Sequence, residues 1–221
     1  GHPAKVFILI GTNDIGSGLT QEHAAENLQK ILERFRLESP ETKVFVQSIL
    51  PSNNGKRTGL VAGLNERLRT VCRKANVTFI NLYDLMSDGE GNMKEGWSFD
   101  NLHPKVPGYR AWCQTLLPYL DEGSNVKHTC AYGEGLPDIH GNQFNSWGAR
   151  LGTLAMLPIE ADDTVFIGDE MIHSGEWHEL LDSPHAKNRG TGWGYPGADL
   201  GLLMPEIPHF FHANPKSVCP R

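Results

Sequence analysis

The sequence predicts an α/β fold, a doubly wound sandwich in which a five-stranded parallel sheet carries helices on both faces. Short apolar runs recur along the chain, and most are apolar enough to be buried on both faces, as parallel strands are. Segments with helical spacing lie between these runs. The 221 residues suffice to bury the core of one such domain.

The expected strands are apolar runs bounded by turn residues. They cover residues 5–10, 43–50, 77–82, 164–168 and, more weakly, 186–189. A stripe of apolar residues predicts a helix over 20–37, with Thr20 as its N-cap and Glu22 in its first turn. Similar stripes predict helices within 60–71, 106–120 and 144–157.

Residues 121–142 interrupt this alternation. They are rich in glycine and polar residues and show no periodicity, so we interpret them as a connector. Residues 1–120 then hold three expected strands, and residues 143–221 hold two. Each piece alone would expose apolar strand edges, whereas together they form a sheet of ordinary size.

Composition and charge exclude several classes of function. The formal net charge is −6, and the densest basic stretches, Lys56-Arg57 among them, look like solvated faces, so we expect no nucleic-acid partner. No apolar run approaches the ~18 residues of a membrane span. Cys72 and Cys113 lie on expected helix faces as small buried apolar groups. The chain opens inside a strand, which we interpret as a fragment or permutation boundary, so no compartment is inferred.

The segment IGTNDIGSG, residues 10–18, places a carboxamide directly after the first expected strand and ahead of a loop. Open α/β sheets bind their ligands at this carboxyl edge. The Asn13 side chain can donate an N–H to a developing oxyanion there. An Asx-turn that simply ends the strand explains the same residues, and the spacing alone does not decide between the two.

The segment SFDNLHPKVPGYRAW, residues 98–112, holds an acid and a histidine three residues apart in an expected loop. At that separation the Asp100 carboxylate can accept a hydrogen bond from one imidazole nitrogen of His103. The tautomer is then fixed and the other nitrogen is available as a general base. The alternative is a helix-entry loop in which Asp100 is a cap and His103 is incidental.

The segment VFIGDEM, residues 165–171, ends a buried strand with an acidic pair. A strand–Gly–Asp–X turn raises residue X, here Glu170, above the sheet edge at the start of the next helix. The glycine-rich segment KNRGTGWGYPG, residues 187–197, follows the next expected strand and would supply backbone N–H groups beside it.

Taken together, GTND, DNLHP and GDE after a strand resemble the motifs of the SGNH (GDSL-type) hydrolase family. The resemblance is closest to its single-domain acyl-esterase branch, of the platelet-activating-factor acetylhydrolase-like type. It extends to LHPKVPGYRAW, VTFINLYDLM and LPIEADDTVFIGDEMI, and covers nearly the whole chain apart from the connector. It implies a flavodoxin-like fold, a small acyl ester as substrate (acetylated carbohydrate included), and no cofactor or metal.

The resemblance also implies roles for individual residues. Asn13 corresponds to the oxyanion-hole asparagine, His103 to the general base, and Asp100 to the carboxylate that orients it. Glu170 stands where the family has its nucleophilic serine. A second oxyanion N–H would come from Gly192 or Gly194 after a one-residue shift, because Trp193 occupies the aligned place. Ser174 lies four residues past the nucleophile position and is a poor substitute.

The motif order differs from that of the family. The family begins with the GDS strand and the NRG segment and ends with the DxxH loop. Here residues 1–120 resemble the C-terminal half of an SGNH fold, and residues 143–221 resemble the N-terminal half. We therefore expect either a circular permutation or a slice of a tandem repeat. One domain would then be completed within a chain or by segment exchange in a homodimer.

Glu170 divides the functional prediction in two. A carboxylate where negative charge should develop opposes ester hydrolysis and can raise the pKa of the general base. The chain is thus expected to be an acyl-ester hydrolase scaffold of very low activity, or else a non-catalytic binding or structural module. Nucleotide or flavin binding is disfavoured, because GTGWGYPG does not fit GxGxxG at a helix start. The close histidine pairs, 173 with 178 and 209 with 212, look like exposed helix positions rather than metal ligands.

Overall fold

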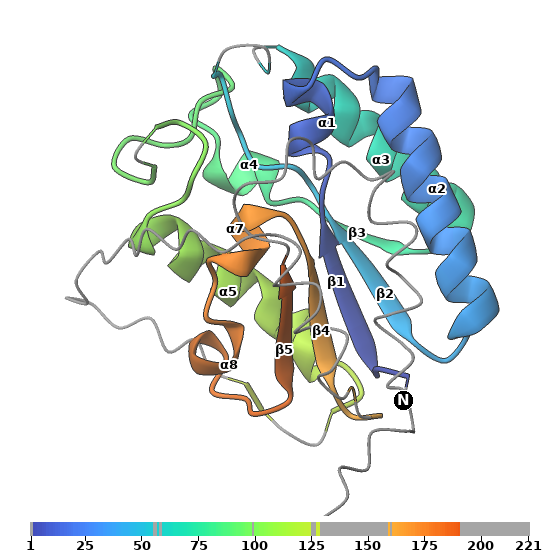
Figure 1. The fold of residues 1–221 in the computed structure, drawn as a ribbon. Coiled ribbons are helices and arrows are strands. Elements are labelled where there is room, and N and C mark those ends of the chain that lie inside the picture. Colours follow the sequence, from blue (N-terminus) through green and yellow to red (C-terminus); the bar gives the residue numbers. More distant parts are fainter. Residues whose placement is uncertain are drawn as a thin grey trace, which may run out of the picture.

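One parallel sheet organises the chain in the computed structural model, which describes residues 2–54, 57, 59–98, 100–124, 127–128, 159 and 161–190 (Figure 1). Its strands are β1 (Lys5–Leu9), β2 (Lys43–Gln47), β3 (Thr78–Ile80), β4 (Thr164–Gly168) and β5 (Ala186–Gly190). The strands lie in the order β3-β2-β1-β4-β5, and every pairing is parallel. The predicted α/β fold with a five-stranded parallel sheet is confirmed.

Helices cover both faces of this sheet, as predicted (Figure 1). The helices are α1 (Thr12–Gly16), α2 (Gln21–Glu38), α3 (Leu60–Ala75), α4 (Tyr83–Met86), α5 (Val106–Asp121), α7 (Glu170–His173) and α8 (Trp177–Leu180). The expected Thr20 cap of α2 is present, since its side chain accepts a hydrogen bond from the His23 N–H at 3.1 Å. The expected helix at 144–157 lies outside the described residues.

The two halves of the core follow from strand alternation, because successive side chains of a strand point to opposite faces. Val6 and Ile8 of β1 pack with α2 and α3 on one face. Phe7 and Leu9 pack with α5 and α8 on the other. The Phe7 ring stacks on Phe45 of β2 and Phe166 of β4, with centroids 4.7 and 5.1 Å apart. Stacked rings across three strands therefore fix the centre of the sheet.

Three strands are shorter than predicted. β1 ends one residue early, at Leu9, and β2 and β3 are shorter because apolar residues there are buried by helices rather than paired in the sheet. The run 43–50 leaves the sheet after Gln47, and Ile49 is bound instead by the buried Asn65 of α3. The Ser48 hydroxyl then accepts the backbone N–H of Leu82, which ends the third strand early. Periodicity could not separate these two kinds of burial.

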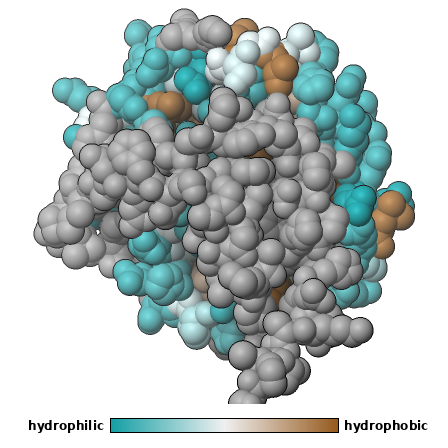
Figure 2. Space-filling model, in the orientation of Figure 1, coloured by the Kyte–Doolittle hydropathy of each residue, from teal (hydrophilic) through white to brown (hydrophobic). Residues whose placement is uncertain are grey.

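Other sequence predictions have simple outcomes. The expectation of an exposed His173 is wrong, because this histidine is buried at the end of α7. Cys72 and Cys113 are buried free thiols, as expected, and burial raises the pKa of Cys72 to about 12. No helix among the described residues is long and apolar enough to cross a membrane. On the face shown in Figure 2 the described residues are mostly hydrophilic, with hydrophobic areas that are small and separate. Among the described residues, the exposed large hydrophobic side chains are Leu37 and Leu60.

Candidate active site

The two central strands end side by side, and this places the first two motifs next to each other. Leu9 of β1 is in register with Gly168 of β4. Successive strands are added from β1 toward β3 on one side and from β4 to β5 on the other. The order of addition therefore reverses between β1 and β4, although all the strands are parallel. Ligand sites of open α/β sheets lie at the carboxyl ends of strands at such a point.

Glycines permit the close turns at both strand ends. An added Cβ on Gly168 would collide with the Leu9 carbonyl oxygen and with Ile172, so only glycine allows this approach of β4 to β1. Gly11 has φ +122°, a conformation that side chains disfavour. After it the chain enters the short helix α1, which contains Asn13. The GTND segment therefore enters a helical turn that continues to Gly16, whereas we expected a loop to follow Asp14.

Glu170 opens helix α7 directly after β4 and is only 8% exposed. Its Oε2 accepts a hydrogen bond from Asn13 Nδ2 at 3.2 Å. Its Oε1 lies 3.6 Å from His103 Nε2, a separation that makes the contact an ion pair rather than a hydrogen bond. Each oxygen of one buried carboxylate thus faces a different predicted site residue.

The loop before α5 holds His103 in a defined orientation. His103 Nδ1 lies 2.6 Å from Asp100 Oδ2, and the His103 backbone N–H donates to Asp100 Oδ1 at 2.9 Å. The Ser98 hydroxyl donates to the His103 carbonyl oxygen at 2.9 Å. These contacts direct Nδ1 toward Asp100 and leave Nε2 facing Glu170.

Further hydrogen bonds connect the elements that carry these residues. The Tyr109 hydroxyl of α5 donates to the Met171 carbonyl oxygen of α7 at 3.2 Å. Asn188 of β5 donates through Nδ2 to the carbonyl oxygens of Ile172, His173 and Gly175, at 3.1, 3.0 and 2.7 Å. The Asn188 amide therefore binds the carbonyls at the end of α7, a role that the glycine-rich pattern around it did not indicate.

Electrostatics favour the charged forms of His103 and Glu170. Burial alone would lower the pKa of His103, but Glu170 and Asp100 outweigh it and hold that pKa above its ordinary value. Burial alone would raise the pKa of Glu170, but His103 and Asn13 outweigh it and hold that pKa below its ordinary value. Both shifts favour an imidazolium between two carboxylates.

Asp169 behaves in the opposite way. It is fully buried, and burial together with the neighbouring Glu170 charge raises its pKa well above the ordinary value. Its Oδ1 accepts a hydrogen bond from the Met171 N–H at 3.1 Å, so it caps α7. Of two adjacent acids, burial favours the neutral form of the Asp169 cap, whereas His103 and Asn13 favour the charged form of Glu170.

Arg57 is a neighbour of the site that sequence reasoning missed, because Lys56-Arg57 looked like a solvated face. Its Nη2 donates to Asn13 Oδ1 at 3.4 Å, and its Nε donates to the Thr12 carbonyl oxygen at 3.3 Å. The side chain is half-buried. No spacing in the sequence relates this loop arginine to the end of β1.

The contacts among Asn13, Asp100, His103 and Glu170 limit the reactions that the site can catalyse. Asn13 offers a donor and His103 an imidazole, but the group between them is a carboxylate, which has no proton to give when ionised. Ser174 is exposed at the C-cap of α7, one turn away from Glu170. Gly192, Gly194 and Trp193 lie outside the described residues.

A family model for GDSL-like lipases and acylhydrolases matches residues 1–111, half of the chain. The chain belongs to the GDSL-like lipase/acylhydrolase family. The matched part contains Asn13, Asp100 and His103, whereas Glu170 lies beyond it. The expected family is thereby confirmed, and the finer branch and the permuted order stay predictions.

Three solved structures that are similar to this chain come from bacteria. A GDSL-like lipase from Bacteroides thetaiotaomicron is 20% identical, with a TM-score of 0.49 over 55% of this chain and 64% of its own. A Streptococcus pneumoniae protein described as a platelet activating factor is 29% identical, with a TM-score of 0.47 over 52% and 58%. A Bacteroides fragilis protein described as an acylhydrolase is 21% identical, with a TM-score of 0.49 over 55% and 62%. This chain therefore spans less than two thirds of their length, and no curated protein matches it.

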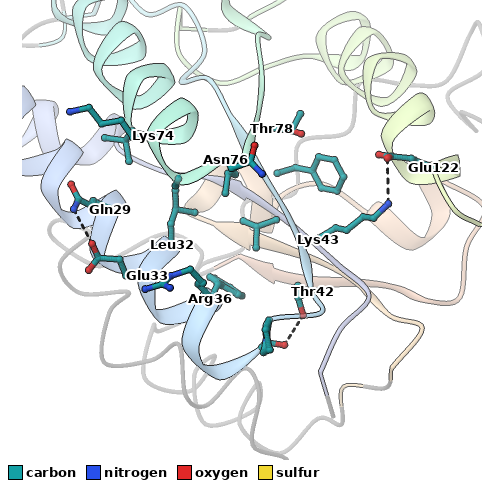
Figure 3. Close-up of a pocket in the computed structure, with 18 residues that line it drawn as sticks. Gln29, Leu32, Glu33, Arg36, Thr42, Lys43, Lys74, Asn76, Thr78 and Glu122 are labelled. Atoms are coloured by element: carbon teal, nitrogen blue, oxygen red, sulfur yellow. Dashed lines mark hydrogen bonds and ion pairs between the residues drawn. The ribbon is translucent and has the colours of Figure 1, made fainter.

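A cavity of about 820 Å³ lies at the opposite edge of the sheet (Figure 3). It is lined by the C-terminal parts of α2 and α3 and by the first residues of β2 and β3. Several of its polar groups already bind one another: Gln29 donates to Glu33 at 2.9 Å, and Lys43 lies 3.3 Å from Glu122. None of the predicted site residues lines this cavity.

Asp162, Asp163 and His185 also gather at the amino ends of β4 and β5. Lys187 Nζ lies 3.6 Å from Asp163 Oδ1 and supplies a positive charge there already. The geometry of this group is that of a small salt-bridge cluster.

Proposed function

We propose that this chain is an SGNH-type scaffold for acyl ester hydrolysis in which Glu170 occupies the nucleophile position, so that its own esterase activity is very low. One observation carries the proposal. The Glu170 carboxylate lies 3.2 Å from Asn13 Nδ2 and 3.6 Å from His103 Nε2. A serine hydroxyl at this position would face the same two side chains from further back, because the serine side chain is two carbons shorter.

With a serine at position 170 the reaction would follow the Ser-His-Asp pattern. The hydroxyl oxygen attacks the ester carbonyl carbon while His103 Nε2 takes its proton, and the carbonyl π electrons become an oxyanion. Asn13 Nδ2 donates to that oxyanion. When the oxyanion collapses, the alkoxide leaves with the proton from His103. Water then repeats the sequence on the acyl-serine and releases the acid.

Glutamate opposes every step of this sequence. Its carboxylate has no hydroxyl proton for His103 to remove, and its negative charge lies where the oxyanion would form. It also occupies the Asn13 donor and pairs with the imidazole. Loss of a triad nucleophile costs roughly 10⁶ in rate in a serine protease, more than the remaining donors can recover.

The test is hydrolysis of a chromogenic acetate ester by the unmodified chain and by Glu170→Ser. We expect negligible turnover by the first and measurable turnover by the second, abolished by a further His103→Ala change. Glu170→Gln is the matched control, because it removes the charge without adding a nucleophile. Robust turnover by the unmodified chain that depends on His103 would refute the proposal. A folded but inactive Glu170→Ser variant would also count against it.

The second candidate function is a non-catalytic module, and the burial of Glu170 favours it. At 8% exposure the carboxylate leaves little of itself for a ligand to contact. The cluster would then serve stability. The stability of Glu170→Ser separates the two candidates: a clear loss of stability without activity supports the structural module, and activity supports the hydrolase scaffold.

The finer identity belongs to the same proposal. A small acyl ester, acetylated carbohydrate included, and the platelet-activating-factor acetylhydrolase-like branch come from the motif resemblance. Numbering the strands from β4 turns the spatial order into 2-1-3-4-5, that of flavodoxin-like sheets, which supports the permuted arrangement of 1–120 and 143–221. Light scattering tests the homodimer alternative: a dimer favours segment exchange, and a monomer favours completion within one chain.

A further inference from the structure

Arg57 contacts the side chain of Asn13. The proposed role of Asn13 depends on which end of its carboxamide faces residue 170. The Asn13 carboxamide has an acceptor end and a donor end of nearly the same shape, and its neighbours determine the orientation. Arginine has donors only, so Arg57 Nη2 at 3.4 Å requires an oxygen in front of it. The donor Nδ2 is then turned toward Glu170.

Resting on the proposed function, we infer that Arg57 is a positioning residue that holds the Asn13 donor toward residue 170. In the unmodified chain Glu170 supports the same orientation from the other side, since a carboxylate requires a donor. When residue 170 is serine that support is absent. Among the described residues, Arg57 is then the charged group that still favours this orientation of the Asn13 carboxamide.

The local packing supports a built contact rather than a chance one. The guanidinium is anchored twice, because Nε also donates to the Thr12 carbonyl oxygen at 3.3 Å. It lies against Gly16 of α1, where an added Cβ would be 2.6 Å from Arg57 Nη2. The flexible guanidinium can yield to such a group more easily than the backbone can. Gly16→Ala therefore displaces the Arg57 head group while keeping its charge.

The experiment follows the Asn13 side-chain amide by ¹⁵N relaxation in the full chain carrying Glu170→Ser. We expect an ordered amide, and an order parameter that falls toward the roughly 0.6 of flexible groups with either Arg57→Gln or Gly16→Ala. Arg67→Gln is the matched control, because Arg67 is an exposed arginine of α3 that is paired with Glu22 of α2. An Asn13 amide equally ordered in all variants overturns the inference.

A kinetic arm separates positioning from a general effect of charge. In the Glu170→Ser chain, Arg57→Gln should lower kcat about tenfold with KM unchanged, since removing an oxyanion donor outright costs 10² or more. This fall in kcat should vanish when Asn13 is also replaced by alanine. A fall that persists in the Asn13→Ala background would show a direct effect of the Arg57 charge and would overturn the inference. The kcat of Arg57→Lys should lie between those of the arginine and glutamine forms. An ammonium keeps the charge but lacks the planar guanidinium that reaches both the Thr12 carbonyl oxygen and Asn13 Oδ1. If Glu170→Ser is inactive, the proposed function fails, and the amide order still decides the role of Arg57.

Discussion

Replacing Glu170 with glutamine tests the charged cluster with little change of shape. At 3.6 Å two unit charges attract by about 4–5 kcal/mol at an effective dielectric constant near 20. Burial of both groups offsets much of this attraction. Asp100 remains beside His103 in the variant, and glutamine can still bond to Asn13. We therefore expect a net loss of about 1–3 kcal/mol in the free energy of unfolding.

The pH dependence of that loss follows from the two pKa directions. The raised pKa of His103 contributes stability that is full below its unfolded value of 6.5 and is lost as pH rises through the folded value. The lowered pKa of Glu170 contributes stability that is full above its unfolded value of 4.5 and is lost as pH falls through the folded value. The difference between parent and variant should thus be greatest between pH 4.5 and 6.5.

Urea unfolding at about pH 5.5 and pH 9 measures this difference, provided that the slope m is unchanged. The His103 imidazole should in parallel show a lower pKa in the variant, read from its ¹³Cε1 shift. Glu22→Gln is the control, since its surface ion pair with Arg67 is exposed and should matter little. Equal destabilisation at both pH values, or an unchanged His103 pKa, would show that the two side chains are not coupled.

Two further predictions concern the space around Glu170. Glu170→Ala should leave a place for a small carboxylate, so acetate should raise the melting temperature of this variant in a concentration-dependent way. No such rise should occur when Asn13→Ala is added to Glu170→Ala, and a rise there would contradict the contact between Asn13 and the carboxylate. Gly168→Ala should destabilise the fold by more than ~2 kcal/mol, because its Cβ would meet the backbone of Leu9. Gly18→Ala, which meets no neighbour within 4 Å, should cost only about 1–2 kcal/mol of backbone strain in urea unfolding, and equal losses at both glycines would contradict the close approach.

Much of this site could be predicted because strand ends are readable from sequence. A buried run followed by Gly-Asp-Glu identified β4 with its bounds, and the run before GTND identified β1. The family resemblance implied that Asn13 and Glu170 belong to one site, and the two side chains share a hydrogen bond. The Asp100–His103 contact was likewise expected from their local spacing.

The remaining features depend on packing between segments that have no sequence relation. Ile49 and Leu50 are apolar because helices bury them, so the second strand was predicted three residues too long. Arg57 lies 44 residues from Asn13, and a lysine-arginine pair in a polar loop carries no sign of the amide that it orients. Asn188 is part of the predicted fifth strand, and its three bonds to carbonyls in and just after α7 follow only from the pairing of β5 with β4.

Under the proposed function, the cluster keeps an imidazole, its acidic partner and a carboxamide without catalysis, because the same contacts connect distant parts of the chain. Glu170 lies 157 residues from Asn13 in sequence and joins the ends of β4 and β1 to the loop before α5. A carboxylate does this better than a serine hydroxyl, since its two oxygens reach both neighbours and its charge strengthens both contacts. Stability and esterase chemistry therefore place opposite demands on position 170. A single substitution there should exchange one for the other.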